Sequence, residues 1–394
     1  MKKIKMVIGA NFGDEGKGKM VSYFCSQSKN PIVVRPNGGA QAGHTVCYGN
    51  KRHVFHHFGS GTLQGVPTYC DKEFIVNPII FRKEYEELSA IGVEPKIYVH
   101  FACKVTLPAD MMKNQFDETS RGKNRHGSCG LGIFATINRK KPITIDFIDS
   151  HIDTQDFLEM IMDADEEFNP SDYMDLSVSY KDIILKYIED LYFMMDHITI
   201  CSGDDIWNAF DDIIFECSQG LLLSCDNIIY FPHLTPSCTG SRNLYLSSLI
   251  GNLYSMISGN ELEICYVSRA YNTRHGAGPL PYECDKRDIR LDLPSDKTNV
   301  YNEFQGKFRY AGIDTENLCC RIKHDIYTPG LMNKISVSIC ITHLDETSNM
   351  FIGPYLNEIP VNIIDDEFDI VYHSFGEQTN DIKIHKNHKK GDEV

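Results

Sequence analysis

Short apolar runs alternate along the chain with longer, helix-like segments of mixed apolar and polar residues. Several of the short runs are continuously apolar, which is typical of strands buried on both faces of a parallel sheet. The alternation predicts an α/β fold with a large, mostly parallel central sheet flanked by helices. Strands are predicted at residues 4–8, 31–34, 74–76, 96–101, 197–201, 213–216, 262–267 and 334–341, and helices at 81–91, 154–164, 180–195 and 244–258.

Two segments differ in composition from the rest of the chain. Residues 146–212 are strongly acidic, and the sequence N-P-S-D at 169–172 indicates a turn between helices. We expect this segment to be a partly helical insertion with a solvated surface, rather than a specific binding element. Residues 381–394 are polar and mixed in charge, which is typical of a frayed tail. We therefore expect residues 1–380 to form one domain.

The composition limits the class of protein. No apolar run approaches the roughly 20 residues that span a bilayer, and the N-terminal residues lead directly into the first predicted strand. We expect a cytoplasmic protein without a signal peptide or a membrane partner. A net charge of −15 argues against binding to nucleic acid, which needs a basic surface.

The fourteen cysteines show no C-x-x-C spacing, and Cys319 and Cys320 are adjacent. We expect most of them to be reduced and buried, as in a cytoplasmic protein, rather than ligands of a zinc ion.

The most informative motif is I-G-A-N-F-G-D-E-G-K-G-K at residues 8–19, where a strand leads through a glycine-rich turn into a predicted helix. Such a junction presents backbone N–H groups to an anion, and the helix dipole adds to the attraction. Gly13, Gly16 and Gly18 would let phosphate oxygens approach the backbone closely. The motif departs from the phosphate-loop pattern G-x-x-x-x-G-K-[ST]. Phosphate chemistry remains a better explanation than an ordinary turn.

Charged residues in the same loop suggest roles in that chemistry. Lys17 and Lys19 could neutralise phosphate charge, and Asp14 could bind a metal ion or accept a proton.

A second loop, N-G-G-A-Q-A-G-H-T at 37–45, ends on His44. This histidine could act as a general acid or stabilise charge on a transferring phosphoryl group, although a structural role is the alternative. His53, His56 and His57 lie close by, but their spacing gives no tetrahedral metal site. We interpret these three as core or surface histidines.

Three more glycine-punctuated polar loops follow the predicted strands. They are R-H-G-S-C-G-L-G-I at 125–133, E-C-S-Q-G-L-L at 216–222 and N-T-R-H-G-A-G-P-L-P at 272–281. Each is a weak signal alone, but together they predict a ligand site at the strand ends of a doubly wound sheet.

Four of these motifs, in this order, resemble adenylosuccinate synthetase: G-D-E-G-K-G-K, G-G-x-x-A-G-H-T, S-Q-G-L-L-L and T-R-x-G-A-G-P-x-P. The resemblance covers residues 1–380 and implies a fold distantly like that of the GTPases. The family makes adenylosuccinate from IMP, L-aspartate and GTP with Mg²⁺, usually as a homodimer. The 6-oxygen of the purine is phosphorylated first, and the aspartate nitrogen then displaces phosphate.

The resemblance implies roles for individual residues. Asp14 would take the proton from purine N1 and ligate Mg²⁺ together with the Gly43 carbonyl, while Lys17 and His44 would stabilise the phosphoryl group. The implied nucleotide-binding residues are Gly13, Glu15, Gly16, Gly18, Lys19, Asp345, Ser374 and Gly376. The implied purine-monophosphate residues are Gln41, Ser128, Cys129, Arg139, Gln219 and Thr235, and the implied aspartate-binding residues are Gln305, Lys307 and Arg309.

Several substrate-facing positions depart from the family pattern. Lys307 stands where the family carries an arginine, and lysine does not replace a guanidinium fork one for one. The resemblance implies that Asp345 reads the guanine base of the nucleoside triphosphate. His343 stands where the family has a lysine beside this acid, so the phosphoryl donor can be GTP, ATP or dATP. A branch of the family acts on dGMP on the way to diaminopurine DNA, and its best-known members lack the catalytic aspartate. Asp14 favours IMP, yet a carboxylate can accept both N1–H and the 2-amino N–H of guanine, so GMP and dGMP stay possible.

The sequence leaves three hypotheses for function. The first is a ligase that joins aspartate to a 6-oxopurine monophosphate. The second is a nucleotide-binding regulator that has lost turnover, for which the altered aspartate loop is the support. The third is a plain phosphate-loop NTPase or kinase, for which the chain lacks a G-K-[ST] motif.

Overall fold

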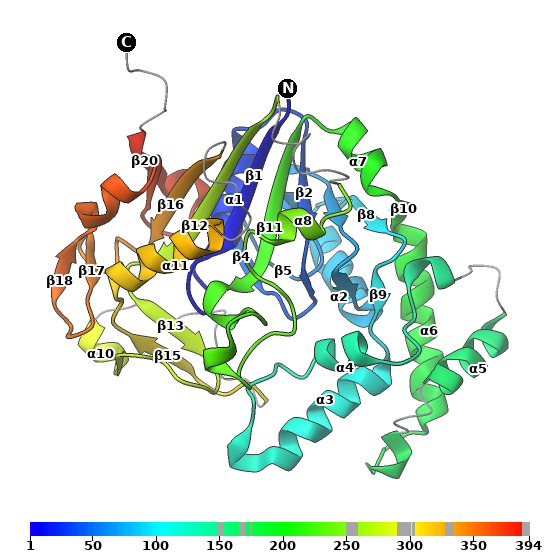
Figure 1. The fold of residues 1–394 in the computed structure, drawn as a ribbon. Helices are drawn as coiled ribbons and strands as arrows, with labels where there is room; N and C mark the ends of the chain where they lie inside the picture. Colours follow the sequence, from blue (N-terminus) through cyan, green and yellow to red (C-terminus); the bar gives the residue numbers. More distant parts are fainter. Residues whose placement is uncertain are drawn as a thin grey trace.

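The computed structural model describes residues 1–148, 153–164, 170–173, 175–249, 259–289, 301, 304–327 and 335–387. A ten-stranded sheet runs through the centre of the molecule (Figure 1). Neighbouring strands are parallel except for the last pair, which is antiparallel. In spatial order the strands are β10 (Thr199–Cys201), β8 (Ile97–His100), β6 (Thr68–Cys70), β2 (Pro31–Arg35), β11 (Asp212–Gly220), β1 (Lys3–Gly9), β12 (Glu261–Arg269), β16 (Ser336–Thr342), β19 (Ile370–Ser374) and β20 (Ile382–Asn387).

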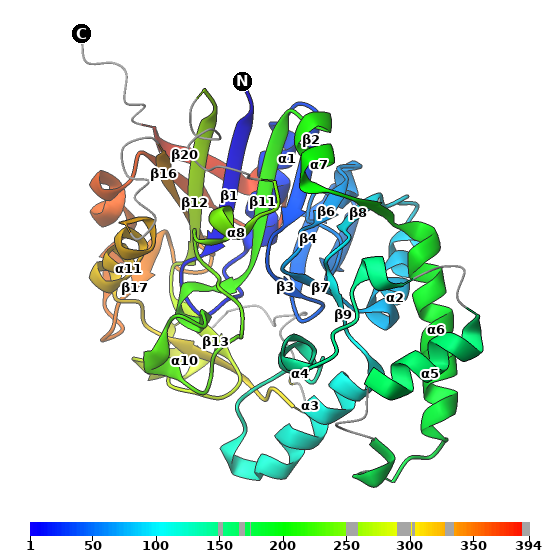
Figure 2. The same cartoon turned by 45° about the vertical axis from the view of Figure 1, so that its right-hand side comes forward.

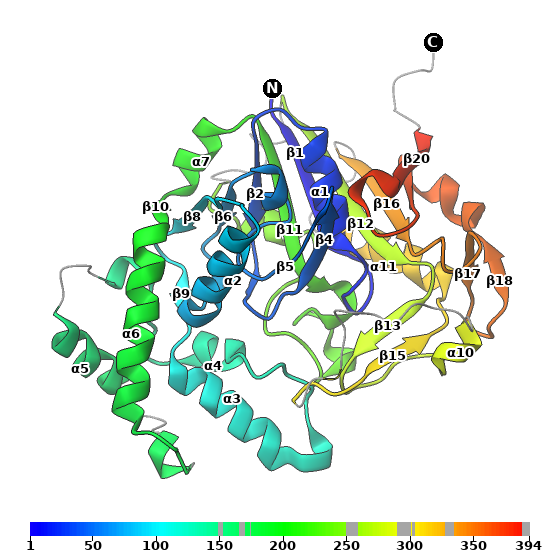
Figure 3. The ribbon, with the colours of Figure 1, turned by 180° about the vertical axis from the view of Figure 1, so that it is seen from behind.

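The central strands are apolar on both sides because helices cover both faces of the sheet. In β1, Met6 and Ile8 pack into one core cluster, and Val7 packs into another on the opposite face. Helix α11 (Thr315–Tyr327) contributes to the first cluster, and α1 (Lys17–Ser26) contributes to the second. The view from behind shows α1 against the sheet (Figure 3).

A third core cluster lies beside the edge strands β8 and β10 and includes residues of α2 (Pro78–Ala90), α5 (Thr154–Ala164) and α6 (Tyr180–His197). These helices stand together at the side of the molecule (Figure 2). Tyr187 of α6 is buried, and its hydroxyl donates to the Thr106 carbonyl at 3.0 Å. The acidic segment is therefore helical in part, as predicted, but its helices are packed against the domain and its strand β10 belongs to the central sheet.

Smaller elements gather beyond the carboxyl ends of the central strands, at the lower end of the molecule in Figure 1. The remaining strands are β3 (Gly38–Gly39), β7 (Phe74–Val76) and β9 (Lys104–Val105), the hairpin β4 (His44–Tyr48) and β5 (Lys51–Phe55), the three strands β13 (Asn272–His275), β14 (Glu283–Cys284) and β15 (Phe308–Ala311), and the pair β17 (Met350–Ile352) and β18 (Glu358–Pro360). The remaining α-helices of the described residues are α3 (Pro108–Arg121), α4 (Ile133–Asn138), α7 (Gly203–Ala209), α8 (Asn243–Leu246) and α10 (Lys286–Ile289).

Two local predictions need correction. The predicted tail is wrong for residues Ile382–Asn387, which form β20 and pair with β19. The predicted helix at 244–258 is interrupted, because α8 ends at Leu246 and Ser247 is extended, with ψ 140°; its residues 250–258 lie outside the described residues. The predicted strand at 74–76 is confirmed as β7, which belongs to a small separate sheet.

Within the described ranges no helix is long and apolar enough to cross a membrane. All fourteen cysteines are free thiols.

Candidate active site

The parallel strands β1, β11, β12 and β16 end at one edge of the sheet, and each has a polar residue at its end or in the loop that follows. Asp14, Gln219 and His343 all have positive φ angles, of 60°, 67° and 62°. A residue with a side chain seldom adopts this conformation, and strained residues of this kind cluster at functional sites. Arg269 is the last residue of β12 and completes the row. The strand ends therefore form a polar and strained edge, as the glycine-punctuated loops predicted.

Glu15 organises the glycine-rich loop from inside. Its Oε1 accepts hydrogen bonds from the backbone N–H groups of Asn11 at 3.0 Å and Gly13 at 2.8 Å, and its Oε2 lies 2.8 Å from Lys17 Nζ. Gly13 and Gly16 have φ angles of 93° and 95°, which a glycine adopts without strain. Glu15 thus fixes the loop backbone and pairs with Lys17, and phosphate binding by this loop stays a prediction.

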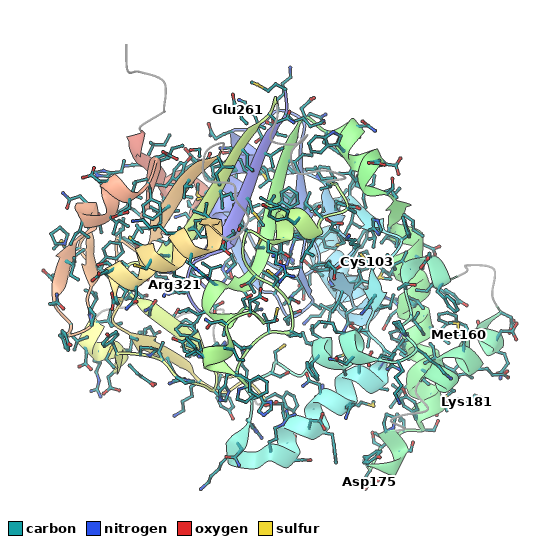
Figure 4. All side chains as sticks on the ribbon, in the orientation of Figure 1. Cys103, Met160, Asp175, Lys181, Glu261 and Arg321 are labelled. Carbon is teal, nitrogen blue, oxygen red and sulfur yellow. The ribbon has the colours of Figure 1, made fainter. Side chains whose placement is uncertain are left out.

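Two arginines brace the same loop from neighbouring elements. Arg269 Nε donates to the Asp14 carbonyl at 2.6 Å. Arg321 of α11, labelled in Figure 4, donates to the Ala10 carbonyl at 2.8 Å and to Asn11 Oδ1 at 2.6 Å. These contacts fix the backbone on both sides of the loop without using the Asp14 carboxylate.

The Asp14 carboxylate is largely buried, and in the described part of the chain it accepts no hydrogen bond. Burial raises its pKa, while the positive charges of Arg269 and Lys17 act to lower it. A carboxyl group in this environment can hold or release a proton and can bind a cation. Asp14 is therefore placed for either of the roles that the sequence suggested.

A second buried group pairs His44 with Glu216 of β11; burial lowers the pKa of His44, while the Glu216 carboxylate acts to raise it. His44 Nδ1 lies 2.5 Å from Glu216 Oε1, and both side chains are buried. Ser60 donates its backbone N–H to Glu216 Oε2 at 2.9 Å and its hydroxyl to Oε1. Because a carboxylate can only accept, Nδ1 of His44 carries a hydrogen and Nε2 is left for a ligand. Glu216 thus fixes the orientation of the His44 ring.

The environment of Glu216 predicts acid sensitivity of the fold. Burial alone would raise the Glu216 pKa, but the His44 and Arg35 charges and the Ser60 hydrogen bonds lower it to about 2. The unfolded chain therefore binds more protons than the folded protein below about pH 4.5, and the unfolding free energy should fall by roughly 3 kcal/mol as the pH drops to about 2. Urea unfolding at pH 6, 4 and 3 measures this, and Glu216→Gln should reduce the dependence. A variant with an unchanged pH dependence would contradict the assignment.

Beyond the strand ends lies a pocket of about 720 Å³ between α3, α4 and the loops around residues 126–131 and 231–236. Both amide atoms of Gln41 are buried and unpartnered in the described structure, so they can serve a ligand. The six residues predicted to bind the purine monophosphate all line the pocket: Gln41, Ser128, Cys129, Arg139, Gln219 and Thr235. Gln305, predicted to bind aspartate, lines it too.

Arg139 lines this pocket from within its own chain. Its Nη2 lies 2.7 Å from Asp110 Oδ1 of α3, and both side chains are nearly buried. Other charged side chains, among them Lys113, Arg121 and Arg274, line the same pocket, and a guanidinium group is a suitable partner for a phosphate.

The two cations predicted to bind aspartate, Lys307 and Arg309, do not line this pocket. Arg309 forms a two-pronged ion pair with Glu283, with Nε 2.7 Å from Oε1, and donates to the carbonyls of Gly276 and Gly278 at 3.0 and 2.7 Å. Lys307 is exposed. Their role in binding aspartate remains a prediction, since Arg309 would first have to leave Glu283.

Lys19 joins the glycine-rich loop to the end of β19. Its Nζ donates to Ser374 Oγ at 2.7 Å and to the Gly376 carbonyl at 2.6 Å, and burial lowers its pKa. Asp345 is exposed at the end of β16 and is close enough to act electrostatically on Lys19. The structure thus brings the predicted nucleotide-binding residues Ser374, Gly376 and Asp345 to one side of the loop, with Lys19 as a brace.

A Mg²⁺ ion prefers oxygen ligands and is often bound by one or two carboxylates together with substrate phosphates. The Asp14 carboxylate and the carbonyl of Gly43, which lies on the exposed turn before His44, fit this preference. The described residues hold no group of three or more His, Cys, Asp or Glu arranged for a metal. An ion bound here would take its other ligands from phosphate and water.

Sequence reasoning missed four residues of the site: Glu216, Ser60, Arg269 and Arg274. Arg274 lines the pocket, and its guanidinium carbon lies 4.7 Å from the centre of the Phe12 ring. Glu216 and Arg274 lie inside motifs that were singled out, so the motif could have indicated them. Ser60 and Arg269 carry no local signal, because their partners are distant in the sequence.

Sequence comparison gives a consistent result. The family model described as adenylosuccinate synthetase matches residues 6–318. An adenylosuccinate synthetase of Marinomonas sp. is 27% identical over 383 residues, covering 90% of this chain and 83% of the relative. The adenylosuccinate synthetase of Photobacterium profundum is 31% identical over 317 residues, covering 78% of this chain and 70% of the relative.

Two solved structures share the fold. Fully ligated adenylosuccinate synthetase from Plasmodium falciparum matches with a TM-score of 0.73 at 18% identity, covering 98% of this chain and 100% of that one. The succinoaminodeoxyadenylate synthetase of cyanophage S-2L, bound to dGMP and dATP, matches with a TM-score of 0.62 at 15% identity, covering 98% and 95%. With a family match over more than half of its length and with the predicted loops gathered at one edge of the sheet, this chain belongs to the adenylosuccinate synthetase family of carbon–nitrogen ligases.

Proposed function

We propose that the protein is a Mg²⁺-dependent ligase that joins L-aspartate to C6 of a 6-oxopurine nucleoside 5′-monophosphate, using a nucleoside triphosphate. The observation that carries the proposal is the buried His44–Glu216 pair, whose members lie three residues along the chain from the pocket-lining Gln41 and Gln219. A regulator would need the pocket and the glycine-rich loop, but not this buried pair.

The reaction requires a better leaving group at C6, because oxide leaves poorly. Asp14 removes the N1 proton of the purine, so that O6 attacks the γ-phosphorus of the triphosphate and displaces the nucleoside diphosphate. The aspartate amine then attacks C6 and loses a proton, the C6–O6 bond breaks, and inorganic phosphate leaves with the former O6. Both steps move negative charge past the same loop.

Lys17 and His44 are placed to stabilise the negative charge of the phosphoryl group. Lys17 lies beside the loop backbone, and Nε2 of His44 is directed away from Glu216. When Nε2 donates to the moving phosphoryl group, Glu216 compensates the positive ring through Nδ1. Bound Mg²⁺ would neutralise phosphate charge next to Asp14 and Gly43.

The substrate class covers both purines that the sequence left open. The two solved relatives are an adenylosuccinate synthetase and an enzyme bound to dGMP and dATP. A single carboxylate such as Asp14 can accept N1–H alone from IMP, or N1–H and a 2-amino N–H from dGMP.

A substrate matrix tests the proposal. Purified protein is incubated with L-aspartate and Mg²⁺, with IMP, GMP and dGMP crossed against GTP, ATP and dATP, and products are identified by mass spectrometry. We expect an aspartate adduct of at least one monophosphate. Turnover of IMP alone assigns purine nucleotide synthesis, and turnover of dGMP assigns the diaminopurine branch. Aspartate-independent release of phosphate would instead favour a plain NTPase.

One observation favours a second candidate, a nucleotide-binding regulator without turnover. Arg309 is engaged by Glu283 and Lys307 is exposed, so neither of the two predicted aspartate-binding cations lines the pocket, although Gln305 does. Nucleotide binding without an adduct in any cell of the matrix would support this candidate. The predicted homodimer is measured separately by light scattering.

A further inference from the structure

The histidine-rich run at residues 53–57 has no role in the proposed chemistry, yet it surrounds a fully buried carboxylate. Glu84 of α2 accepts backbone N–H groups from His56 at 2.8 Å, from His57 at 2.7 Å and from Phe58 at 3.4 Å. The side chains of His53 and His57 lie 3.8 and 3.4 Å from its oxygens. A carboxylate held by three backbone donors fixes the path of that backbone. The segment after β5 is therefore rigidly placed against α2.

The ring of His56 points from this anchored segment toward the neighbouring loop. Its Nδ1 lies 2.6 Å from the Ala42 carbonyl and 3.0 Å from the Ala40 carbonyl. A carbonyl oxygen can only accept, so Nδ1–H is the donor and is shared between the two. One side chain thus ties together the residues on both sides of Gln41.

The clamped loop is the one that faces the substrate. Gln41 lines the pocket with both amide atoms unpartnered, and Gly43 and His44 follow directly. Gly43 is exposed and can move, while His44 must keep its 2.5 Å contact with Glu216. In the described structure the loop is also held at His44, by the Ala42 N–H to Gly39 carbonyl turn at 3.1 Å and by the burial of Ala40 and Ala42, and these contacts leave the carbonyls on both sides of Gln41 to His56.

We infer that His56, anchored through Glu84, is a positioning residue that holds the Gln41–His44 loop in its substrate-binding shape. The role belongs to the proposed ligase site, but it concerns binding of the monophosphate and can be measured without turnover. His56 itself does not line the pocket.

The test compares His56→Ala with His56→Asn. The alanine variant should raise the Kd of the purine monophosphate, measured by calorimetry in the absence of aspartate, and lower kcat/KM about ten- to a hundredfold. The Asn amide can place an N–H where Nδ1–H lies, so His56→Asn should recover most of the loss. The Kd of the triphosphate should stay unchanged in both variants.

His197→Ala is the matched control. His197 Nδ1 also bonds a carbonyl, that of Phe193 at 2.7 Å, but it lies on α6 away from the pocket. The control should lose stability without a change in monophosphate affinity. The inference is overturned if His56→Ala binds the monophosphate as the wild type does, or if triphosphate affinity and Tm fall in step with it. Absence of turnover in the wild type would refute the proposed ligase, whereas the binding comparison would still decide the role of His56.

Discussion

Asp14→Asn is expected to lower kcat by about a thousandfold while the protein still binds its nucleotides, because the amide cannot take the purine N1 proton. Asparagine is the informative replacement, since Asp14 has a φ of 60° and asparagine tolerates this conformation better than alanine does. The backbone bond from Arg269 to the Asp14 carbonyl should therefore survive. Single-turnover formation of the aspartate adduct measures the loss, and equilibrium binding of the triphosphate measures what is retained.

Asp226→Asn makes the same chemical change at an exposed carboxylate that pairs with Arg242 at 3.3 Å. It should leave kcat within a factor of about two, because surface ion pairs contribute little. If Asp14→Asn kept a tenth or more of the wild-type kcat, Asp14 would not be the base.

The second large effect is expected at Glu216. Glu216→Gln should lower kcat by about a hundredfold or more, because the neutral amide does not compensate the positive charge of the His44 ring, and its NH2 group cannot accept one of the hydrogen bonds from His44 and Ser60. The KM for aspartate should change little, since Glu216 is fully buried and does not line the pocket. Steady-state kinetics with saturating donor separates the two parameters.

Glu263→Gln controls for the burial of a carboxylate in the same sheet. Glu263 lies near the amino end of β12 and accepts from Ser338 Oγ at 2.6 Å and Tyr372 at 3.0 Å. This variant should be destabilised but catalytically normal. Equal losses of kcat in the two variants would show that Glu216 acts through stability alone.

The fold was predictable where burial leaves a strong pattern. Strands such as β1 and β12 are covered on both faces, so their continuous apolar runs indicated them directly. Strand β6 has the sequence T-Y-C, without a run of aliphatic side chains, and was missed, whereas the equally short β7, F-I-V, was found. Strand β19 was missed as well, although its partner β16 was found. The predicted helix at 244–258 failed at Ser247, where the extended backbone ends α8 despite the apolar residues on both sides.

The site was predictable where chemistry is local in sequence. Glycines, Asp14 and Lys17 lie within a few residues of each other, and the loop alone indicated an anion cradle. The His44–Glu216 contact joins residues 172 apart, and it exists because β11 lies between β1 and β2 in the sheet. The commitment of Arg309 to Glu283 was equally hidden, since it depends on how β14 and β15 pair.

The strand order also has a consequence for synthesis of the protein. Strands β2, β6, β8 and β10 are made within residues 31–201 and are neighbours in the sheet, so they can pair while the chain is still being translated. Strand β1 is made before them, but its neighbours are β11, which begins at Asp212, and β12, which begins at Glu261. The Lys19 brace needs Ser374, which lies 355 residues farther along. The glycine-rich loop thus leaves the ribosome before all of the strands and side chains that hold it, and it is among the last elements to be held in place.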